Sequence, residues 1–441
     1  MGKKKIEKYT FPYWITYQIA KAIHNLIYRE FYVINRPQKK QEKPSIITPN
    51  HQNALMDAMA VLFAKKEPLV FLARSDIFKQ KAVASILYFL KILPIYRIRD
   101  GFDNLKNNQE TFDHTVRVLS NKRGLVILPE GNHYGAKRLR PLKKGFGRIA
   151  FMTEINGDEQ VDLQIVPTAI DYTAYDTFFS RLTVVFGEPF PLKPYMEEYK
   201  NNSQKALNSI TQHLRKSLQE HIIHIESEKY YDACLLASAV YAENKHSGNN
   251  AEAQKVRFYS QRDAAKVLNK AVAEDSNEFK QMVESAEVLD QKAHGLPHEI
   301  LAKKPSAMSF AGALLSFLLV PLAIPGTIIY GALWYWPIVF VNKKIKDVQF
   351  RTSFRYVLYI VQFFLLLLGI FIYLFSAHPP KTALIVFIMT ILSGVLSLKI
   401  WRLVYWYYLK AKWFIKSLKK PELLRARNIV IEKVESLIGK G

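Results

Sequence analysis

The sequence is poor in the residues and spacings that build cross-links and metal sites. Its 441 residues include one cysteine, Cys234, so no disulfide can form within the chain. Zinc-finger spacing, an RNA-recognition signature and a basic region followed by heptads are all missing from the sequence. We therefore expect a reducing, cytosolic setting for the soluble part and no nucleic-acid partner.

The amino-terminal residues lack a cleavable leader and a lipidation signal. Lysines follow Gly2, but no compact apolar core with a small-residue cleavage site comes after them. Ile6 stands where a myristoylation motif needs serine or threonine. The sequence therefore predicts neither a cleaved signal peptide nor N-myristoylation.

Acidic residues are heavily outnumbered. The chain has 62 lysines and arginines against 38 aspartates and glutamates, which gives a formal net charge of +24. Such an excess draws a protein towards nucleic acid or an anionic membrane face. Because long apolar runs occur in the same chain and nucleic-acid motifs do not, we expect the partner to be membrane lipid.

Apolar residues are concentrated late in the chain. Residues 1–300 have the mixed composition of a soluble protein, whereas apolar runs dominate from Met308 to Ile400. We divide the chain accordingly. The expected segments are an amphipathic interfacial helix at 1–30, a catalytic domain at 31–195, a charged helical extension at 196–306, a membrane region at 307–401 and a basic cytoplasmic tail at 402–441.

The amphipathic helix at the start has two possible places. One broad apolar face is formed by Trp14, Ile15, Ile19, Ile23, Leu26 and Ile27. Its aromatic start suits a helix that lies in the membrane interface. A helix packed on the domain core would show the same pattern, and both alternatives stay open.

Three apolar blocks make up the membrane region. Blocks 356–375 and 382–400 are each long enough for one span, at ~20 residues per span. Block 308–341 is longer and contains Pro325-Gly326, which predicts a break and a re-entrant hairpin. Loop 342–355 has five basic residues and one acidic residue, so the positive-inside rule places it and the catalytic domain in the cytoplasm.

Strands and helices alternate through the catalytic domain. We expect strands at 31–35, 45–49, 68–73, 93–98, 124–129, 162–171 and 182–187, and helices near 54–64, 80–91, 107–120 and 145–155. This order predicts an α/β fold with a mostly parallel sheet flanked by helices. Ligands bind such sheets at the carboxyl ends of the strands. Pro167 lies inside an expected strand, which is typical of an edge strand or a bulge.

A histidine and an aspartate follow the second expected strand. In IITPNHQNALMDAMAVL (46–62), His51 lies in the loop and Asp57 in the first turns of the next helix. Histidine suits a general base near neutral pH, and a carboxylate on its other ring nitrogen fixes the tautomer. On one continuous helix the two would point about 120° apart. His51 must therefore lie off the helix, with Asn53 or a neighbour turning the chain.

Further polar residues follow other expected strands. Arg97 and Arg99 could bind a phosphate, or form a surface salt bridge. Glu130 could accept a hydrogen bond from a substrate hydroxyl and Gly131 allows close backbone approach, although an ordinary turn explains both. Lys144 precedes an expected helix start, where anions are favoured.

Taken in order, these motifs resemble the blocks of the glycerol-3-phosphate and 1-acylglycerol-3-phosphate (lysophosphatidate) acyltransferase family. The resemblance covers residues 31–190. The blocks are matched by His51 and Asp57, by the stretch ending at Arg97, by Pro129-Glu130-Gly131 and by Val166-Pro167.

The resemblance implies an O-acyltransferase with a glycerolipid-acyltransferase-like fold. The acyl group would pass from acyl-CoA or acyl carrier protein to a hydroxyl of glycerol 3-phosphate or 1-acylglycerol 3-phosphate, without metal or organic cofactor. His51 would be the base and Asp57 its partner. The phosphate would bind Arg97, with Arg99 or Lys144, and the glycerol would bind at Glu130 and Gly131.

The sequence departs from the family pattern at two places. Five residues separate His51 from Asp57, where four are usual, and this gap is similar to that of fungal-type glycerol-3-phosphate acyltransferases. It raises glycerol 3-phosphate or dihydroxyacetone phosphate as acceptor. The third block usually continues Thr-Arg, but here it continues Asn132-His133. A different lyso-lipid acceptor, such as an amino-acid lipid, is therefore an alternative.

Weaker patterns are explained without chemistry. Glu220, His221, His224 and Glu226 have helical spacing, which is more typical of a polar helix face than of a metal site. Cys234 has no activating partner in the sequence and is interpreted as packing. A non-enzymatic lipid-binding or transport protein would explain the interrupted apolar block. The scarcity of ionisable groups in the apolar runs argues against transport.

Overall fold

The computed structural model describes residues 6, 8–37, 43–95, 108–156, 161–246, 248 and 250–440, without the side chains of 108–110. These residues form two compact units. Unit 1 comprises Met1–Ile222 together with Val348–Ser353, and unit 2 comprises Ile223–Asp347 together with Phe354–Gly441.

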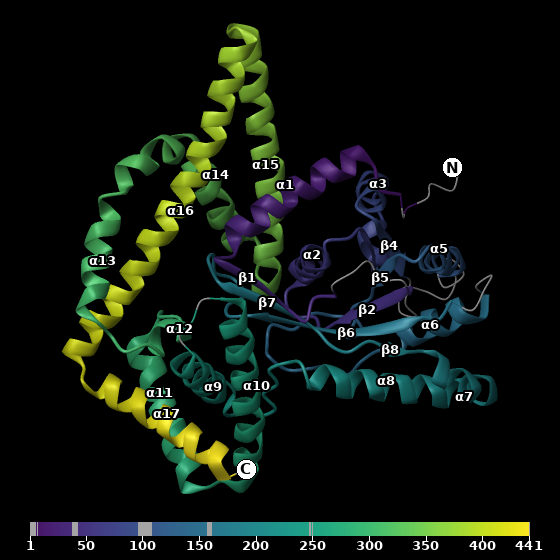
Figure 1. The fold of residues 1–441 in the computed structure, drawn as a ribbon, viewed down its shortest axis with the longest axis horizontal. Coiled ribbons are helices and arrows are strands. Elements are labelled where there is room, and N and C mark those ends of the chain that lie inside the picture. Colours follow the sequence, from purple (N-terminus) through teal and green to yellow (C-terminus); the bar gives the residue numbers. More distant parts are fainter. Residues whose placement is uncertain are drawn as a thin grey trace. The chain divides into compact units, whose positions relative to one another are not determined.

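Unit 1 is built on one sheet in the order β1-β7-β6-β2-β5-β3-β4, with β8 paired to β6 (Figure 1). The strands are β1 (Glu30–Ile34), β2 (Ser45–Pro49), β3 (Leu69–Arg74), β4 (Ile92–Ile95), β5 (Gly124–Val126), β6 (Gln164–Tyr172), β7 (Arg181–Phe186) and β8 (Phe190–Pro191). Every pairing from β6 through β2, β5 and β3 to β4 is parallel, whereas β7 and β8 run antiparallel to β6. The predicted α/β fold with a mostly parallel sheet is confirmed.

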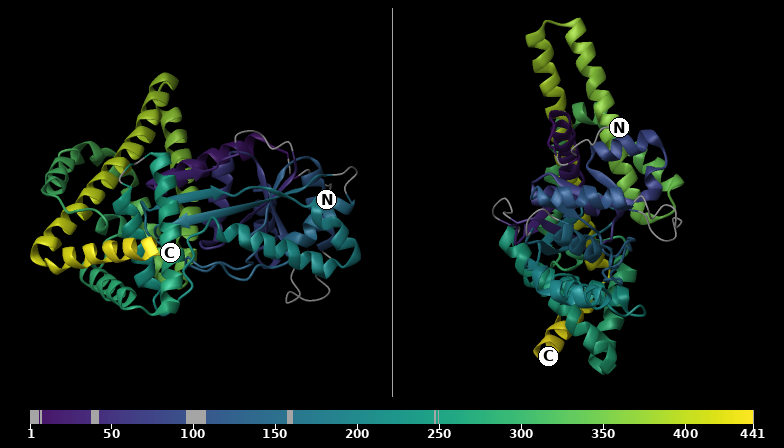
Figure 2. Two further views of the ribbon diagram at one scale, coloured as in Figure 1. Left: turned by 60° about the horizontal axis from the view of Figure 1, so that its bottom comes forward. Right: turned by 90° about the vertical axis from the view of Figure 1, so that its right-hand side faces the viewer.

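The central strands are buried along their whole length, which requires cover on both faces of the sheet. All residues of β2 and of β7 are buried. The helices of unit 1 are α1 (Phe11–Ile27), α2 (Ala54–Lys65), α3 (Lys81–Phe89), α5 (Asn108–Ser120), α6 (Gly145–Asn156), α7 (Met196–Asn201) and α8 (Ser203–Gln219). Figures 1 and 2 show α1 on one side of the sheet and α8 on the other.

Helix α8 belongs to unit 1, although we expected the catalytic domain to end at residue 195. Its apolar stripe of Leu207, Ile210, Leu214 and Leu218 is buried. Leu207 and Ile210 pack so closely on Gly147 of α6 that a side chain there would lie 3.0 Å from Leu207. The stripe therefore covers the sheet domain.

Pro167 lies in an interior strand, so the expectation of an edge strand is wrong. β6 has β2 on one side and β7 with β8 on the other. The carbonyl of Pro167 accepts a hydrogen bond from Gly187 N (2.8 Å), so its polar groups face the side where β7 ends at Phe186 and β8 begins at Phe190. The sheet tolerates the missing N–H because the neighbouring strand is interrupted there.

Helix α1 combines features of both alternatives for the start of the chain. Its buried face is formed by Tyr13, Ala20, Ile23, His24 and Ile27. This face packs on the core, where the His24 ring lies edge-on to Phe63 at 4.8 Å between centroids. Trp14 and Ile15, expected on the packed face, are exposed, and Phe11 is 71% exposed. The first turns of α1 therefore present aromatic groups to the surroundings.

Unit 2 consists of helices in the part of the chain that the structure describes. The predicted helical extension contains α9 (Tyr231–Lys245), α10 (Ala251–Glu274), α11 (Asn277–Ala293) and α12 (His298–Leu301), and α17 (Glu422–Lys440) packs against them. Cys234 is buried in α9, and burial raises the pKa of its thiol to about 12. A thiol in this environment is a packing group.

Three long apolar helices follow the extension. They are α14 (Val320–Lys344), α15 (Val348–Ala377) and α16 (Pro380–Lys419), and each is long and apolar enough to cross a membrane. α15 and α16 run side by side as a hairpin (Figures 1 and 2). A shorter apolar helix, α13 (Ala307–Phe317), precedes them.

The break predicted at Pro325-Gly326 is wrong. α14 continues through Pro325 and Pro337, and the apolar block is interrupted instead between α13 and α14, at Leu318 and Leu319. Pro337 cannot donate to the carbonyl of Leu333, one turn earlier. That carbonyl accepts a hydrogen bond from the Gln362 side chain, which replaces the missing helical bond.

Gly326 serves close packing between α14 and α16. A Cβ atom at Gly326 would lie 2.2 Å from the backbone oxygen of Ser393. Next to it, Thr327 Oγ1 and Ser397 Oγ lie 2.9 Å apart. Small residues of this kind allow two helix backbones to approach within an apolar bundle.

Gly326→Ala should therefore destabilise unit 2. The new methyl group has to push a backbone oxygen away, and overpacking of this kind costs about 1–3 kcal/mol. The matched control is Gly369→Ala in α15, because a Cβ atom there meets nothing within 4 Å. The melting temperature of the detergent-solubilised protein should fall for Gly326→Ala alone. Equal melting temperatures for the two variants would contradict the close approach.

Candidate active site

The polar motifs meet at the carboxyl edge of the parallel strands. His51 follows β2 by two residues, Glu130 follows β5 by four, and Tyr172 ends β6. Asn50 joins the neighbouring strands at this edge, because its side-chain amide accepts from Ile170 N (2.7 Å) and donates to Ile170 O (3.1 Å). The loop that carries His51 is thereby fixed to the sheet.

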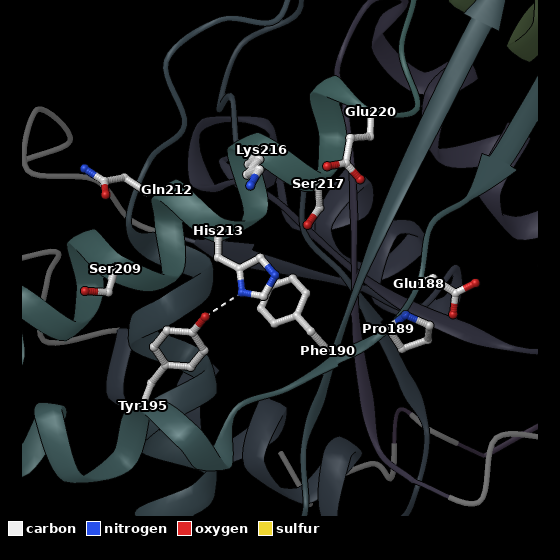
Figure 3. A pocket seen from close by; sticks show the side chains of 10 residues that line it. All are labelled: Glu188, Pro189, Phe190, Tyr195, Ser209, Gln212, His213, Lys216, Ser217 and Glu220. Atoms are coloured by element: carbon white, nitrogen blue, oxygen red, sulfur yellow. Dashed lines mark hydrogen bonds between the residues drawn. The ribbon is translucent and has the colours of Figure 1, made fainter. Parts of the chain in front are cut away.

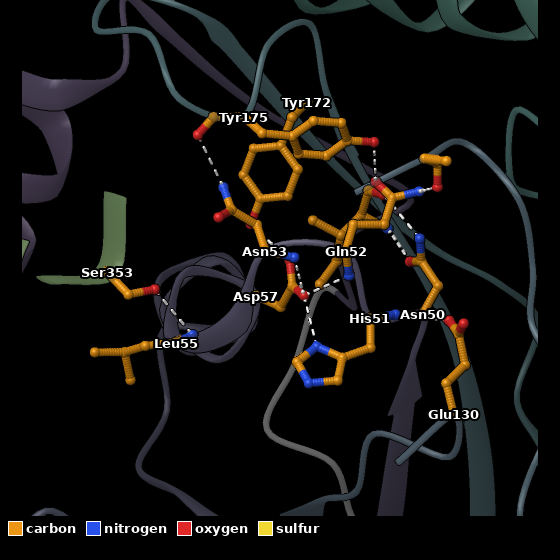
Figure 4. A network of polar contacts seen from close by, with 12 residues as sticks. Asn50, His51, Gln52, Asn53, Leu55, Asp57, Glu130, Tyr172, Tyr175 and Ser353 are labelled. Atoms are coloured by element: carbon orange, nitrogen blue, oxygen red, sulfur yellow. Dashed lines mark hydrogen bonds and ion pairs between the residues drawn. The ribbon is translucent and has the colours of Figure 1, made fainter. Parts of the chain in front are cut away.

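His51 and Asp57 form a hydrogen-bonded pair (Figure 4). His51 Nδ1 lies 2.8 Å from Asp57 Oδ2. The aspartate side chain is fully buried, whereas the histidine side chain is 15% exposed. Because Nδ1 faces the carboxylate, Nε2 is the ring nitrogen directed away from Asp57. This is the arrangement that a general base oriented by a carboxylate requires.

Three further donors hold the Asp57 carboxylate. Asp57 Oδ2 accepts from the backbone N–H groups of Gln52 (2.7 Å) and Asn53 (2.8 Å). Asp57 Oδ1 accepts from the hydroxyl of Tyr172 (2.8 Å). Burial and the nearby Asp57 raise the pKa of Tyr172 well above its usual value, so the phenol stays protonated and donates. A buried carboxylate is thus supplied with hydrogen bonds on both oxygens.

The extra residue between His51 and Asp57 is accommodated by a left-handed turn. Ala54, the first residue of α2, has φ of +43°, which is uncommon for a residue other than glycine. Asn53 precedes the helix as expected, but its side chain makes no capping bond and donates instead to the carbonyl of Tyr175 (3.3 Å). We expected Asn53 or a neighbour to turn the chain, and the neighbouring Ala54 does so.

Glu130 supports the backbone of the site. Its Oε1 accepts from His51 N (2.7 Å) and its Oε2 from Arg140 N (3.1 Å). Burial raises the pKa of Glu130 to about 7, although both backbone hydrogen bonds act in the opposite direction. The carboxyl group therefore positions His51, a role that we did not predict. Its contact with a substrate hydroxyl stays a prediction.

The remaining predicted site residues fall in three places. Gly131 has φ of +72°, a conformation that favours glycine, and its N–H donates to Leu128 O (3.1 Å). Lys144 directly precedes α6, as predicted, and is partly exposed. Arg97 and Arg99 lie outside the described residues. Their phosphate-binding role, and that of Lys144, stays a prediction.

His133 lies beside His51. The ring centroids of His133 and His51 are 5.5 Å apart, with the planes at 78°. Tyr134 N donates to His51 O (3.1 Å), which ties the loop containing His133 to the loop containing His51. The residue at the unusual position of the third block is therefore part of the site.

Several residues of the site were missed in the sequence analysis. Tyr172 stands one residue beyond the expected strand 162–171, and its place at the carboxyl edge was the available signal. The segment Val348–Ser353 also contacts the site, through Phe350 at 4.4 Å from the His133 ring and through Ser353, which accepts from Leu55 N (3.1 Å). No sequence pattern connects residues almost 300 positions apart.

A surface pocket of about 680 Å³ lies elsewhere in unit 1 (Figure 3). Phe190 and His213 stack in it with centroids 4.0 Å apart, and Tyr195 reaches the same imidazole. β8, which contains Phe190, pairs with the first residues of β6, at the end of the sheet opposite to Tyr172. The pocket is therefore separate from the His51–Asp57 pair.

Part of the chain is similar to known acyltransferases. Residues 30–171 match the family model described as Acyltransferase. Residues 30–171, about a third of the chain, are therefore similar to acyltransferases. The matched residues include all of β1 to β5, the His51–Asp57 pair and Glu130.

Two relatives illustrate how far the similarity extends. A Caenorhabditis elegans protein, provisionally named 1-acyl-sn-glycerol-3-phosphate acyltransferase acl-1, is 24% identical over 188 residues, or 42% of this chain. The match spans 66% of that relative, slightly less than two thirds of its length. The crystal structure of the 1-acyl-sn-glycerophosphate (LPA) acyltransferase PlsC from Thermotoga maritima aligns at 16% identity with a TM-score of 0.32, over 46% of this chain and 79% of that one.

Removing the Tyr172 hydroxyl should slow acyl transfer. Tyr172→Phe deletes the donor to Asp57 Oδ1 and leaves that oxygen buried without the bond. Hydrogen bonds to charged groups contribute about 1.5–3 kcal/mol, so kcat should fall roughly tenfold or more. Tyr134→Phe is the control, because Tyr134 contacts His51 only through its backbone and its ring is exposed. Steady-state kinetics on purified protein would expose an error if both variants were equally active.

Glu130 should make the stability of the protein depend on pH. Its folded-state pKa of about 7 exceeds the usual 4.5, so the folded state binds the proton more tightly than the unfolded state. The stability from this group is therefore complete below pH 4.5 and is lost as pH rises towards 7. The wild-type free energy of unfolding, minus that of Glu130→Gln, should fall by about 1–3 kcal/mol over this interval. Denaturation series at several pH values test this, and a difference that stays constant or rises would contradict it.

Proposed function

We propose that this chain is an O-acyltransferase of glycerophospholipid synthesis. The acceptor is glycerol 3-phosphate or 1-acylglycerol 3-phosphate, and the donor is acyl-CoA or acyl carrier protein. The observation that carries the proposal is the His51–Asp57 pair, 2.8 Å apart at the carboxyl edge of the sheet inside the acyltransferase domain. A partly exposed histidine with a buried carboxylate behind it, hydrogen-bonded on both oxygens, fits proton transfer from a substrate hydroxyl.

The proposed reaction proceeds by general base catalysis. His51 Nε2 takes the proton from the acceptor hydroxyl as its oxygen attacks the thioester carbonyl carbon. The carbon–oxygen bond forms, the carbon–sulfur bond breaks, and the imidazolium returns its proton to the departing thiolate. Asp57 stabilises the imidazolium. It also fixes the tautomer in which His51 Nδ1 carries the proton and donates it to the Asp57 carboxylate in a hydrogen bond. The products are an acyl ester and the free thiol.

Cationic side chains bind the acceptor phosphate in this proposal. We propose that Arg97, with Arg99 or Lys144, binds the phosphate, because guanidinium groups bind phosphate oxygens bidentately. Gly131 and Glu130 would position the glycerol part. The proposed chemistry uses no metal or organic cofactor, since a histidine base and a thioester leaving group are sufficient.

The lipid product of this reaction carries an acyl chain, which partitions into membranes. The three long apolar helices support membrane association of the chain. We propose that it is a multi-pass protein with the acyltransferase domain at the cytoplasmic face, because residues 342–355 and the tail after residue 401 are basic. Residues 342–355 are not the loop that we expected, since only 345–347 lie between α14 and α15. The exposed aromatic groups at the start of α1 suit contact with the bilayer interface.

His51→Ala should abolish acyl transfer. Membranes containing the wild type or the variant are incubated with glycerol 3-phosphate or 1-acylglycerol 3-phosphate, each with acyl-CoA and with acyl carrier protein thioester. Loss of a general base costs about 10²–10⁴ in rate. The lipid product is identified by mass spectrometry, which also decides the acceptor and the donor.

The control for this experiment is His378→Ala, which changes an exposed histidine between α15 and α16. It should leave the product yield unchanged. Undiminished acyl transfer by His51→Ala, at the same protein level, would remove His51 from the mechanism. Absence of any acylated product from the wild type with all four substrate pairs would count against the proposed substrates.

A further inference from the structure

The first two turns of α15 lie against the catalytic loop of the acyltransferase domain. Val348–Ser353 belongs to unit 1, although the family match ends at residue 171. Ser353 is 5% exposed, and its Oγ accepts a hydrogen bond from Leu55 N at 3.1 Å (Figure 4). Leu55 is the second residue of α2, the helix that carries Asp57. A segment from far along the chain thus contacts the first turn of the helix that carries Asp57.

The bond from Leu55 replaces a missing helix cap. The N–H groups of the first helical turn have no partner within the helix and are usually capped by the side chain of the preceding residue. Here that residue is Asn53, whose side chain is directed to Tyr175 instead. Ser353 supplies the acceptor from another helix. The start of α2 is therefore capped by a hydroxyl 298 residues away.

A second set of contacts ties the same segment to the catalytic turn. The carbonyl of Tyr175 accepts from both Thr352 Oγ1 (2.6 Å) and Asn53 Nδ2 (3.3 Å). The hydroxyl of Tyr175 donates to Gln52 Oε1 (3.3 Å). Gln52 and Asn53 are the two residues whose backbone N–H groups hold Asp57 Oδ2. Thr352 therefore reaches the aspartate through Tyr175 and the turn residues, whereas Ser353 contacts the first turn of the helix that carries Asp57.

A third contact reaches the histidine side of the site. The Phe350 ring lies edge-on to His133, with centroids 4.4 Å apart, and His133 in turn lies beside His51. Gln349 packs against Gly135 so closely that a side chain there would meet it at 2.7 Å. Both loops of the catalytic site are thus in contact with the start of α15.

These contacts matter because the catalytic turn is strained. Ala54 has a positive φ, and such a conformation persists only where the surroundings determine it. The turn sets the directions of the Gln52 and Asn53 N–H groups, which in turn set the direction of the Asp57 carboxylate. If the turn relaxed, Asp57 would lose its alignment with His51 Nδ1.

We propose that Ser353 is a positioning residue for the His51–Asp57 pair, assisted by Thr352, and that Val348–Ser353 forms part of the catalytic unit. This proposal rests on the proposed function. The segment acts through the turn at residues 52–55, so its loss lowers the rate of the chemical step while leaving substrate binding largely intact. A purely structural cap would change the yield of folded protein and leave the turnover of the folded fraction unaltered.

The test compares three full-length variants by kinetics per folded molecule. Ser353→Ala removes the acceptor, Ser353→Thr keeps a hydroxyl, and Ser376→Ala removes a hydroxyl of the same helix that bonds only within it, to Tyr373 O. We expect kcat of Ser353→Ala to fall roughly ten- to a hundredfold, as small misplacements of catalytic groups do. KM for both substrates should stay within about twofold. Ser353→Thr should recover most of the activity, and Ser376→Ala should match the wild type.

A second substitution guards against failure of Ser353→Ala to fold. Thr352→Val keeps the shape of the side chain and deletes its donor to Tyr175 O. Its kcat should fall severalfold at unchanged KM. A wild-type kcat for Thr352→Val and for any folded Ser353→Ala would overturn the proposal, as would Ser353→Thr being as impaired as Ser353→Ala.

The His51→Ala variant separates this proposal from the proposed function. If His51→Ala remains active, the general-base mechanism itself fails. If His51→Ala is inactive while both Ser353→Ala and Thr352→Val turn over normally, the mechanism stands and only the positioning role of Val348–Ser353 is removed.

Discussion

The structure of the site depends on how one buried carboxylate is satisfied. Asp57 is fully buried in α2, and a carboxylate in such a place is stable only when its oxygens receive hydrogen bonds. Two come from the backbone of the turn before the helix, one from the last residue of β6, and one from His51. These hydrogen bonds bring the turn before α2, the end of β6 and His51 together around the Asp57 carboxylate. His51 is therefore aligned by one of the hydrogen bonds that the buried Asp57 carboxylate receives.

The parallel sheet makes that convergence possible. β2 is flanked by β5 and β6, and all three run in the same direction, so the loops that follow them meet at one edge. Glu130, after β5, holds the backbone N–H of His51, while Tyr172, at the end of β6, holds Asp57. Each neighbouring strand thus fixes one member of the pair. The interruption between β7 and β8, which accommodates Pro167, lies away from this edge and leaves it intact.

Features determined by local pattern could be predicted from the sequence, whereas features determined by distant contacts could not. Continuous apolar runs placed β2 and the order of strands and helices, and the position of His51 relative to Asp57 required a turn between them. The choice between Asn53 and a neighbour as the residue that makes the turn stayed open, because a positive φ at Ala54 has no sequence signature. Pro325-Gly326 resembled a helix break, but Gly326 is small because α16 passes close to it. That reason is tertiary and is invisible in the local sequence.

The contacts of Ser353 are another tertiary feature that the local sequence does not show, and they bear on the proposed function of the site. The residues that match the acyltransferase family include His51, Asp57 and Glu130, and they end before Tyr172 and long before Val348. Four of the bonds to the turn, to the start of α2 and to Asp57 therefore come from outside the matched segment. The matched segment contains the His51–Asp57 pair, whereas a hydrogen bond to the helix that carries Asp57 comes from the beginning of an apolar helix. Because that helix is one of the three long enough to cross a membrane, a single element contains both a contact to the catalytic turn and a candidate membrane span. Any displacement of its first turns would act directly on the N-terminus of α2, and through the turn before it on the carboxylate that orients His51.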